Sequence, residues 1–345
     1  MNAKFMKTMA ASALALAMGA GASMAQEVTL KLHQFLPAQA NVPKLVLDVW
    51  ADAVEKDSGG KIKVERYASM ALGGKPPELM DQAIDGVADI VWTVVGYTPG
   101  RFPQTEVFEL PFMTQGAGPA SCAYSKMFDA HMKDADFKDV HIIGTWVHGP
   151  GMIHANKEIR TPADLAGVKI RGGSRIVSQM LEQLGATPVG MPVPAVSEAL
   201  SKGVLDATTI PWEVTAALKV PELVKNHTEF TGGALYNITF VLAMNKAKYE
   251  SLSPEAKAAI DAHSGLDFSV FAGKTQEGAD GPAREAAVAL GNNIVTLTAE
   301  ETNVWREAAQ PVYAAWIADM QAKGIDGAAL IKEAQDLQAG ECAGK

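Results

Sequence analysis

Runs of apolar residues alternate with stretches of helical periodicity along most of the chain. Val28–His33 alternates apolar and polar positions as a half-buried strand does, and a loop over residues 34–40 follows it. Residues 42–58 carry apolar side chains at helical spacing and stop at Gly59, a residue type that commonly ends helices. The same reasoning predicts a strand, a helix and a nearly continuous apolar strand over Ile62–Tyr67, residues 76–85 and residues 88–94. Strands that alternate with helices predict an α/β fold with right-handed crossovers, and the apolar strand is typical of a buried parallel sheet.

A second α/β set follows farther along the chain. The predicted elements are helices over residues 120–133 and 174–184 and strands over residues 140–147 and 168–171, followed by a strand, a helix and a strand before Pro211. A long apolar strand over residues 236–243 could return the chain to the first set. Residues 254–290 have a helical pattern interrupted near Gly265 and Gly281, and a helix pair of that length could span both sets. Thr298 begins another helix, with Glu301 at the spacing of a capping box.

These two sets predict a two-lobed α/β protein with a cleft between the lobes and a long bridging helix. No internal repeat or flexible tether separates the sets, so we expect several strand crossings and a hinge motion that closes the cleft. The predicted organisation is a signal peptide over residues 1–25, lobe 1 over residues 26–149 and 238–275, lobe 2 over residues 150–237 and 276–335, and a C-terminal tail over residues 336–345.

The first residues have the pattern of a secretory signal peptide. Lys4 and Lys7 precede an apolar run over residues 9–20, and small residues end at Ala25. The run is too short to span a bilayer, which takes about 20 apolar residues. We therefore expect an exported, periplasmic protein that begins near Gln26, and an uncleaved amphipathic anchor is the alternative.

Charge and cysteine content restrict the classes of partner. The formal net charge is −9, which disfavours binding to nucleic acid or to anionic lipid. Local donors in a closed cleft can nevertheless bind an anion, because they act in a low dielectric. The two cysteines, Cys122 and Cys342, could form a disulfide that holds the C-terminal tail or could remain free thiols. Neither lies in a Cys-x-x-Cys motif, which argues against redox catalysis and zinc.

Arg171 is the leading candidate for a binding residue. It lies where the strand over residues 168–171 ends and the chain turns through Gly172 and Gly173. Ligands of open α/β folds collect at the carboxyl ends of strands. A guanidinium there is a permanently charged fork of donors suited to a carboxylate or a sulfonate.

Other candidate residues also follow predicted strands. Trp212 and Glu213 come after Pro211 and would supply a ring wall and an anion, whereas their structural roles would be a core ring and a solvated cap. Trp92 and Phe35 end two strands of the first set and should face the cleft. Four further candidates are weaker, because a lone histidine is more often a structural hydrogen-bonding group: Tyr97, His33, His148 and His154. Two aromatic residues of the returning strand fit the core better than the site: Tyr236 and Phe240.

A pocket with these residues would be apolar with one strong anion anchor. It would suit a monoanion with a flat or hydrophobic body, such as an aromatic or short-chain organic acid. Glu213 leaves two alternatives open: a zwitterion whose amine meets Glu213 with cation–π support, or a metal ion that bridges an oxo- or hydroxy-acid. An exported hydrolase is the competing class, but the chain has no Gly-x-Ser-x-Gly, His-Glu-x-x-His or Walker motif. Ser174 is expected to be a helix N-cap, and no catalytic residues and no cofactor are expected.

The order and spacing of several fragments over essentially the whole mature chain resemble a known family. The fragments are Ser58-Gly-Gly-Lys-Ile, Leu72-Gly-Gly, Asp85-Gly-Val-Ala-Asp-Ile, Leu110-Pro-Phe, Thr161-Pro-Ala-Asp-Leu-Ala-Gly-Val-Lys-Ile-Arg, Leu184-Gly-Ala-Thr-Pro-Val and Ala199-Leu-Ser-Lys-Gly-Val-Leu-Asp. They are similar to the DctP-like extracytoplasmic solute receptors of tripartite ATP-independent periplasmic (TRAP) transporters.

This resemblance implies a monomeric two-lobed binder that closes on a small organic acid and delivers it to the membrane permease subunits of a TRAP transporter. A sensor of the same fold is the alternative. The carboxylate-binding arginine of the family falls on Arg171. Two family positions differ, because a second basic position falls near Met152 and an asparagine is replaced by Ile210. These departures disfavour the two-point hydrogen bonding typical of sialic-acid-like or dicarboxylate ligands.

Overall fold

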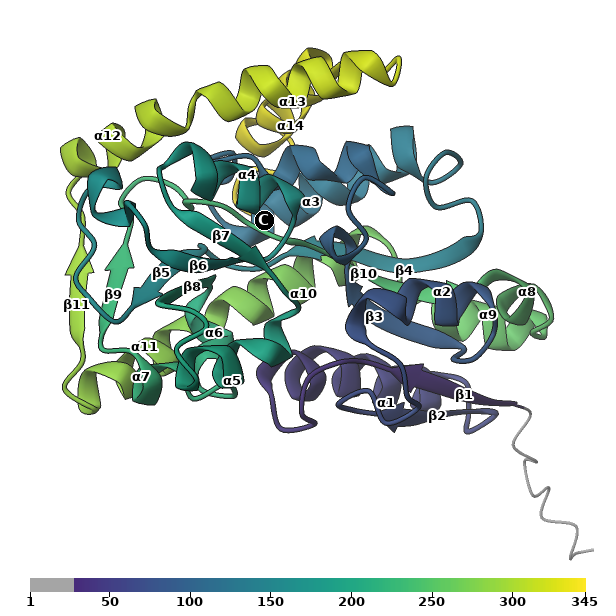
Figure 1. Cartoon of the computed structure of the whole chain (residues 1–345). Helices are drawn as coiled ribbons and strands as arrows, with labels where there is room; N and C mark the ends of the chain where they lie inside the picture. Colours follow the sequence, from purple (N-terminus) through teal and green to yellow (C-terminus); the bar gives the residue numbers. More distant parts are fainter. Residues whose placement is uncertain (1–27) are drawn as a thin grey trace, which may run out of the picture.

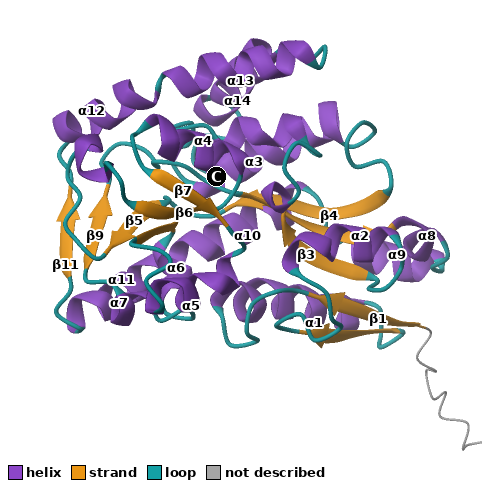
Figure 2. Cartoon of the chain, viewed as in Figure 1, coloured by secondary structure: helices purple, strands orange, loops and turns teal. Residues whose placement is uncertain are grey.

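The computed structural model describes residues 28–345, and within this range the strands form two separate sheets (Figures 1 and 2). The predicted signal peptide, residues 1–25, lies outside the described residues. No helix of residues 28–345 is long and apolar enough to cross a membrane.

The first sheet has five strands in the order β2-β1-β3-β10-β4. Their bounds are Ile62–Tyr67, Val28–His33, Ile90–Val94, Thr239–Asn245 and Val140–Val147. β1 is parallel to β2 and β3, whereas β10 is antiparallel to both β3 and β4. All five residues of β3 are buried, as its continuous apolar sequence requires.

The second sheet has six strands in the order β11-β9-β5-β8-β6-β7. Their bounds are Asn293–Thr296, Asn226–Glu229, Met152–Ala155, Ala207–Ile210, Lys169–Gly172 and Thr187–Gly190. β6 is parallel to both of its neighbours, β7 and β8. The carboxyl end of β6, where Arg171 lies, is therefore at the same edge of the sheet as the carboxyl ends of β7 and β8.

The chain crosses between the sheets more than once, which confirms the predicted two-lobed architecture. It leaves the first sheet after β4 and returns to it by β10. The helices α10 (Leu266–Gly278) and α11 (Asp280–Ala289) bridge the two halves, because α10 packs on α3 and β4 and α11 packs on α6. The predicted break at Gly265 is present, and the second break falls at Ala279. The residue boundaries predicted for the lobes stay a prediction.

The remaining helices cover the faces of the sheets. Their bounds are η1 Pro43–Leu47, α1 Asp48–Asp57, η2 Pro76–Glu78, α2 Leu79–Ile84, η3 Val95–Tyr97, η4 Pro103–Glu109, α3 Ala117–Met127, η5 Phe128–Met132, η6 Pro162–Leu165, α4 Arg175–Gln183, η7 Val193–Ala195, α5 Val196–Ser201, α6 Trp212–Thr215, α7 Val220–Leu223, α8 Lys246–Glu250, α9 Pro254–Asp261, α12 Ala299–Ala309, α13 Pro311–Ala322 and α14 Gly327–Ala339. The last three helices run across one side of the molecule, where they contact α3 of one half and α4 of the other (Figure 1).

Local sequence signals explain several of the boundaries. Ser174 caps α4 by accepting a hydrogen bond from the Val177 amide, and Thr298 and Glu301 form the predicted capping box. The returning strand β10 starts at Thr239 rather than at residue 236, because the carbonyl of Tyr236 is already paired with the amide of Gly151.

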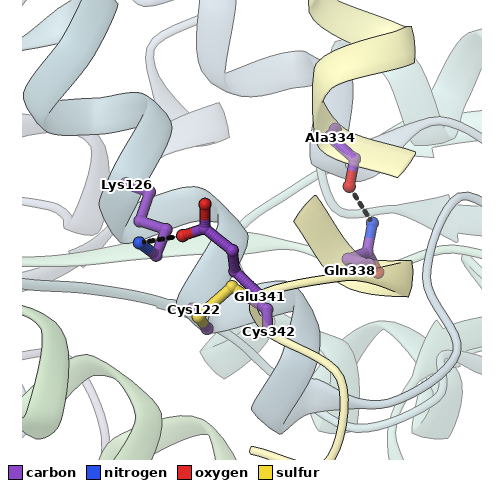
Figure 3. Close-up of a disulfide and its surroundings, with 6 residues drawn as sticks. All are labelled: Cys122, Lys126, Ala334, Gln338, Glu341 and Cys342. Atoms are coloured by element: carbon purple, nitrogen blue, oxygen red, sulfur yellow. Dashed lines mark hydrogen bonds and ion pairs between the residues drawn. A yellow bond between two sulfur atoms is a disulfide. The ribbon is translucent and has the colours of Figure 1, made fainter. Parts of the chain in front are cut away.

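Cys122 and Cys342 are bonded, with 5.6 Å between their Cα atoms (Figure 3). The disulfide attaches the C-terminal tail to α3, and an ion pair of 2.7 Å between Lys126 and Glu341 lies beside it (Figure 3). Of the two alternatives that the sequence left open, the bridge is the one observed.

Candidate ligand-binding site

A cavity lies between residues that follow the strand ends of the two sheets. It holds about 390 Å³ of space between protein atoms, part of which is open to solvent. Its walls are predominantly apolar or aromatic, and they consist of Phe35, Leu36, Trp92, Val94, Tyr97, His148, Arg171, Val193, Ile210, Pro211, Glu213, Val214, Tyr236, Ile238, Phe240 and Gln276.

Arg171 reaches this cavity from β6 and is only 4% exposed. Its Nε donates to the carbonyl of Met191 at 3.0 Å, and its Nη1 donates to the carbonyl of Thr209 at 3.1 Å. Among residues 28–345 no carboxylate lies within 4.0 Å of this guanidinium. Two carbonyls thus fix the orientation of the side chain while its positive charge remains unpaired.

Gly173 forms the support on which the guanidinium rests. A Cβ atom at this position would lie 2.9 Å from Nη1 and 3.1 Å from Cζ of Arg171. The absence of a side chain at residue 173 therefore lets the guanidinium occupy its place beside the backbone.

Three polar side chains of the cavity wall lie within the field of Arg171. Burial raises the pKa of Tyr97 and raises the pKa of Tyr236 to about 12, while the charge of Arg171 opposes both shifts. Burial lowers the pKa of His148 to about 4, and Arg171 adds to that effect. Both tyrosines therefore keep their hydroxyl protons at neutral pH, and His148 is uncharged.

The hydroxyl groups of these two tyrosines belong to the same cavity as Arg171. Tyr97 already accepts a hydrogen bond from the amide of Val193 at 2.8 Å, which leaves its own proton to donate. The hydroxyl of Tyr236 is buried near the side chain of Thr209 but makes no hydrogen bond of good geometry within residues 28–345. Buried polar groups without partners are rare in folded proteins, so a site that contains them is suited to a ligand that supplies the partner.

Aromatic rings that pack against one another line the cavity together with Arg171. Phe35 stacks on Trp92 with 4.5 Å between ring centroids, and Trp92 stacks on Phe240 at 5.5 Å. The ring of Tyr97 meets Phe35 edge to face at 5.8 Å. Offset and edge-to-face pairs of this kind are favourable and leave a surface that suits another planar ring.

Glu213 brings the only carboxyl group among the lining residues, and it comes from the first turn of α6. Its Oε1 accepts a hydrogen bond from Gln276 at 2.8 Å, and its Oε2 has no partner in the described chain. Burial raises the pKa of this carboxyl to about 7, although the hydrogen bond from Gln276 and the nearby side-chain amide of Asn41, which donates to the Glu213 carbonyl, oppose the shift.

The cavity brings together five of the eight residues proposed from sequence: Arg171, Glu213, Trp92, Phe35 and Tyr97. His33, Trp212 and His154 are buried outside its walls. Their ring nitrogens have protein partners, which are Gln82 and the Leu72 amide for His33, Glu229 for Trp212, and His227 and the Ile210 carbonyl for His154.

Four polar or aromatic lining residues, His148, Tyr236, Phe240 and Gln276, were not among the leading candidates. His148 was weighed only as a weak candidate, and Tyr236 and Phe240 were expected in the core, whereas they are both buried and part of the wall. Gln276 was not singled out. Gln276 is on the same face of α10 as the buried Ser269 and Gly273, and this helical spacing is the sequence signal that could have identified it.

No group of three or more histidine, cysteine, aspartate or glutamate side chains in residues 28–345 is arranged to hold a metal ion. The bridging-metal alternative for Glu213 thus receives no support from the geometry.

Comparison with known proteins places this site in context. The family model of DctP, described as bacterial extracellular solute-binding protein, family 7, matches residues 34–319. A TRAP solute-binding protein of Rhodoferax ferrireducens, solved with copurified benzoate, is 48% identical with a TM-score of 0.89, and the match covers 90% of this chain and 98% of that chain. A marine-metagenome TRAP solute-binding protein specific for aromatic acids, solved with 3-hydroxybenzoate, is 46% identical with a TM-score of 0.89 and coverage of 91% and 98%. The C4-dicarboxylate-binding periplasmic protein DctP of Rhodobacter capsulatus is 24% identical over 314 residues, which are 88% of this chain and 90% of that protein.

Proposed function

Because the chain belongs to the DctP family of bacterial extracellular solute-binding proteins and is a TRAP extracytoplasmic solute receptor, we propose that it binds an aromatic monocarboxylate through Arg171. It then delivers this solute, chemically unchanged, to the membrane permease of the transporter. The family is periplasmic, and the same compartment is proposed for this chain.

The observation that carries the proposal is a buried guanidinium without a carboxylate partner in an aromatic cavity. An unpaired buried charge is unfavourable, because it has lost its hydration and gained no counter-ion. A ligand carboxylate supplies that counter-ion and can accept hydrogen bonds from the free guanidinium nitrogen and from the hydroxyls of Tyr97 and Tyr236.

The rest of the cavity favours a planar body on that carboxylate. The stacked rings of Phe35 and Trp92 and the ring of Phe240 offer faces and edges to an aromatic ring. The two TRAP receptors that share nearly half of their residues with this chain bind benzoate and 3-hydroxybenzoate. Their ligands agree in charge and shape with the solute that this cavity would accept.

A dicarboxylate fits the same walls poorly. Arg171 is the only lysine or arginine among the lining residues, so a second carboxylate would have no cation to pair with. It would instead face apolar side chains or Glu213, which would cost several kcal/mol as an uncompensated buried charge.

The test is ligand binding to protein that has been unfolded and refolded to remove copurified solute. Benzoate should raise the melting temperature, because a ligand at about a hundred times its Kd adds about 2.7 kcal/mol to the free energy of unfolding. Succinate should give no such shift, and chromatography should recover benzoate unchanged. Stabilisation by succinate together with no response to benzoate or to any substituted benzoate would contradict the proposal.

A further inference from the structure

Glu213 is held in the cavity wall more firmly than a solvated cap would be. The side-chain amide of Asn41 donates to the carbonyl of Glu213 at 2.7 Å, and the amide of Glu213 donates to the carboxyl of Asp280 at 2.7 Å. Its side chain is fixed as well, and the residue is only 3% exposed. The two backbone contacts come from the segment after β1 and from α11, so the backbone of Glu213 is held from both sides, and Gln276 of α10 holds its carboxyl.

The neighbouring amide is fixed in orientation by a second contact. The indole Nε1 of Trp146 donates to Oε1 of Gln276 at 2.8 Å, so the amino group of Gln276 must be the end that meets Glu213. Oε1 of Glu213 is therefore an occupied acceptor. Oε2 is shielded from bulk water and has no partner in residues 28–345.

The polar groups of the cavity fall into two separate sets. Arg171 is held by the carbonyls of Met191 and Thr209, whereas Glu213 is held by Gln276 and Asp280, so the two charged residues share no hydrogen-bond partner. Both line the same cavity, together with the aromatic rings. A ligand held by its carboxylate at Arg171 would present another part of its ring to Glu213.

We propose, on the basis of the function proposed above, that Glu213 is a specificity-determining residue whose free oxygen hydrogen-bonds a hydroxyl group on the ring of the bound aromatic acid. The receptor consequently prefers hydroxylated benzoates to benzoate itself. A hydroxyl group suits this oxygen whether the carboxyl is ionised or protonated, because a hydroxyl can donate and accept, whereas an ammonium group can only donate. A ligand without such a group leaves Oε2 buried and unpaired, which disfavours its binding.

The first test compares ligands on the refolded wild-type protein by calorimetry. The set is benzoate and its 3- and 4-substituted hydroxy, fluoro, methyl and aminomethyl derivatives. At one of the two positions the hydroxy compound should bind about tenfold more tightly than benzoate and than the methyl and fluoro compounds, since one hydrogen bond is gained. Equal affinities of the hydroxy and methyl compounds at both positions would overturn the inference, and so would a preference for an aminomethyl compound.

The second test repeats the benzoate and hydroxybenzoate measurements on Glu213→Met, which keeps the length of the side chain and removes both oxygens. The ratio between the Kd values of benzoate and of the preferred hydroxybenzoate should fall below about twofold in this variant, whatever the change in the benzoate Kd itself. A preference that keeps its wild-type size in this variant would overturn the inference. Should Glu213→Met not fold, the wild-type ligand series alone decides. Absence of binding by every aromatic acid would instead contradict the proposed function, so the two failures are distinguishable.

Discussion

Gly173 offers the sharpest way to disturb the proposed anion site without replacing any of the side chains proposed to bind the ligand. In Gly173→Ala the new methyl group would lie 2.9 Å from Nη1 and 3.2 Å from Nη2 of Arg171. Ordinary contact requires about 3.5 Å or more, so the guanidinium must move by about half an ångström or rotate. The backbone of Gly173 is outside the left-handed region, so alanine brings no conformational strain of its own.

The expected effect falls on binding rather than on folding. The group that must move is the far end of a long side chain, so we expect the melting temperature of ligand-free Gly173→Ala to stay close to that of wild type. The moved guanidinium gives up the alignment of at least one charge-assisted hydrogen bond to the ligand carboxylate. Such a bond contributes about 1.5–3 kcal/mol, which corresponds to a rise of roughly 10- to 150-fold in the Kd for benzoate.

Calorimetry with benzoate on refolded protein measures this effect, and Gly190→Ala is the matched control. Gly190 is the residue paired with Gly172 between β6 and β7, and a Cβ atom there would meet nothing within 4 Å. The control should bind benzoate like wild type. A folded Gly173→Ala protein with a Kd within twofold of wild type would refute the argument that the guanidinium is placed by its contact with residue 173.

Two further predictions concern stability. Burial raises the pKa of Asp280 to about 8, and the charges of Glu213 and Glu277 add to the shift. The folded protein therefore keeps this carboxyl protonated at pH values where the unfolded chain has lost the proton. The resulting contribution to the free energy of unfolding is fully present below about pH 4 and is lost as the pH rises through about 8. Between pH 5 and pH 8, the free energy of unfolding measured in urea should therefore fall less in Asp280→Asn than in wild type, by up to about 1.4 kcal/mol per pH unit, and equal slopes would contradict this assignment. Replacing both Cys122 and Cys342 by alanine should lower the melting temperature, because the bridge closes a span of 220 residues, worth at most about 5 kcal/mol in the chain-entropy model. Benzoate affinity should be unchanged in that variant because neither residue lines the cavity, and loss of binding would contradict the assignment of the bridge to structure alone.

Strand ends were the part of the site that the sequence could predict. Arg171 lies near the carboxyl end of β6 and Phe35 follows β1, whereas Trp92, which was expected to end its strand, is the middle residue of β3; all three line the cavity. Strand order could not be obtained in this way, because pairing between distant segments depends on contacts that no local pattern encodes. Tyr236 and Phe240 line the cavity because β10 returns to the first sheet between β3 and β4. The sequence does not reveal this strand order, so both residues were expected in the core.

The candidate side chains that lie outside the cavity show the limit of the same reasoning. Trp212 and Glu213 are adjacent, but successive residues of a helix point about 100° apart. Trp212 packs against Ala283 and Ala287 of α11, while Glu213 reaches the cavity. Which of the two side chains faces the cavity depends on the direction in which α6 starts after Pro211, and the residue types alone do not predict that direction. His154 has the same problem in β5, where the alternation of faces turns its ring toward His227.

The central claim is that a buried guanidinium with no partner of its own binds the carboxylate of the solute. Calorimetry of benzoate, or of the tightest-binding benzoate derivative, against wild type, Arg171→Ala and Arg171→Lys tests it most directly. We predict that Arg171→Ala weakens binding by roughly 30-fold to several thousand-fold, the equivalent of about 2–5 kcal/mol, and that Arg171→Lys restores only part of it, because lysine lacks the planar fork of donors. A folded Arg171→Ala protein that binds the ligand with near-wild-type affinity would contradict the account.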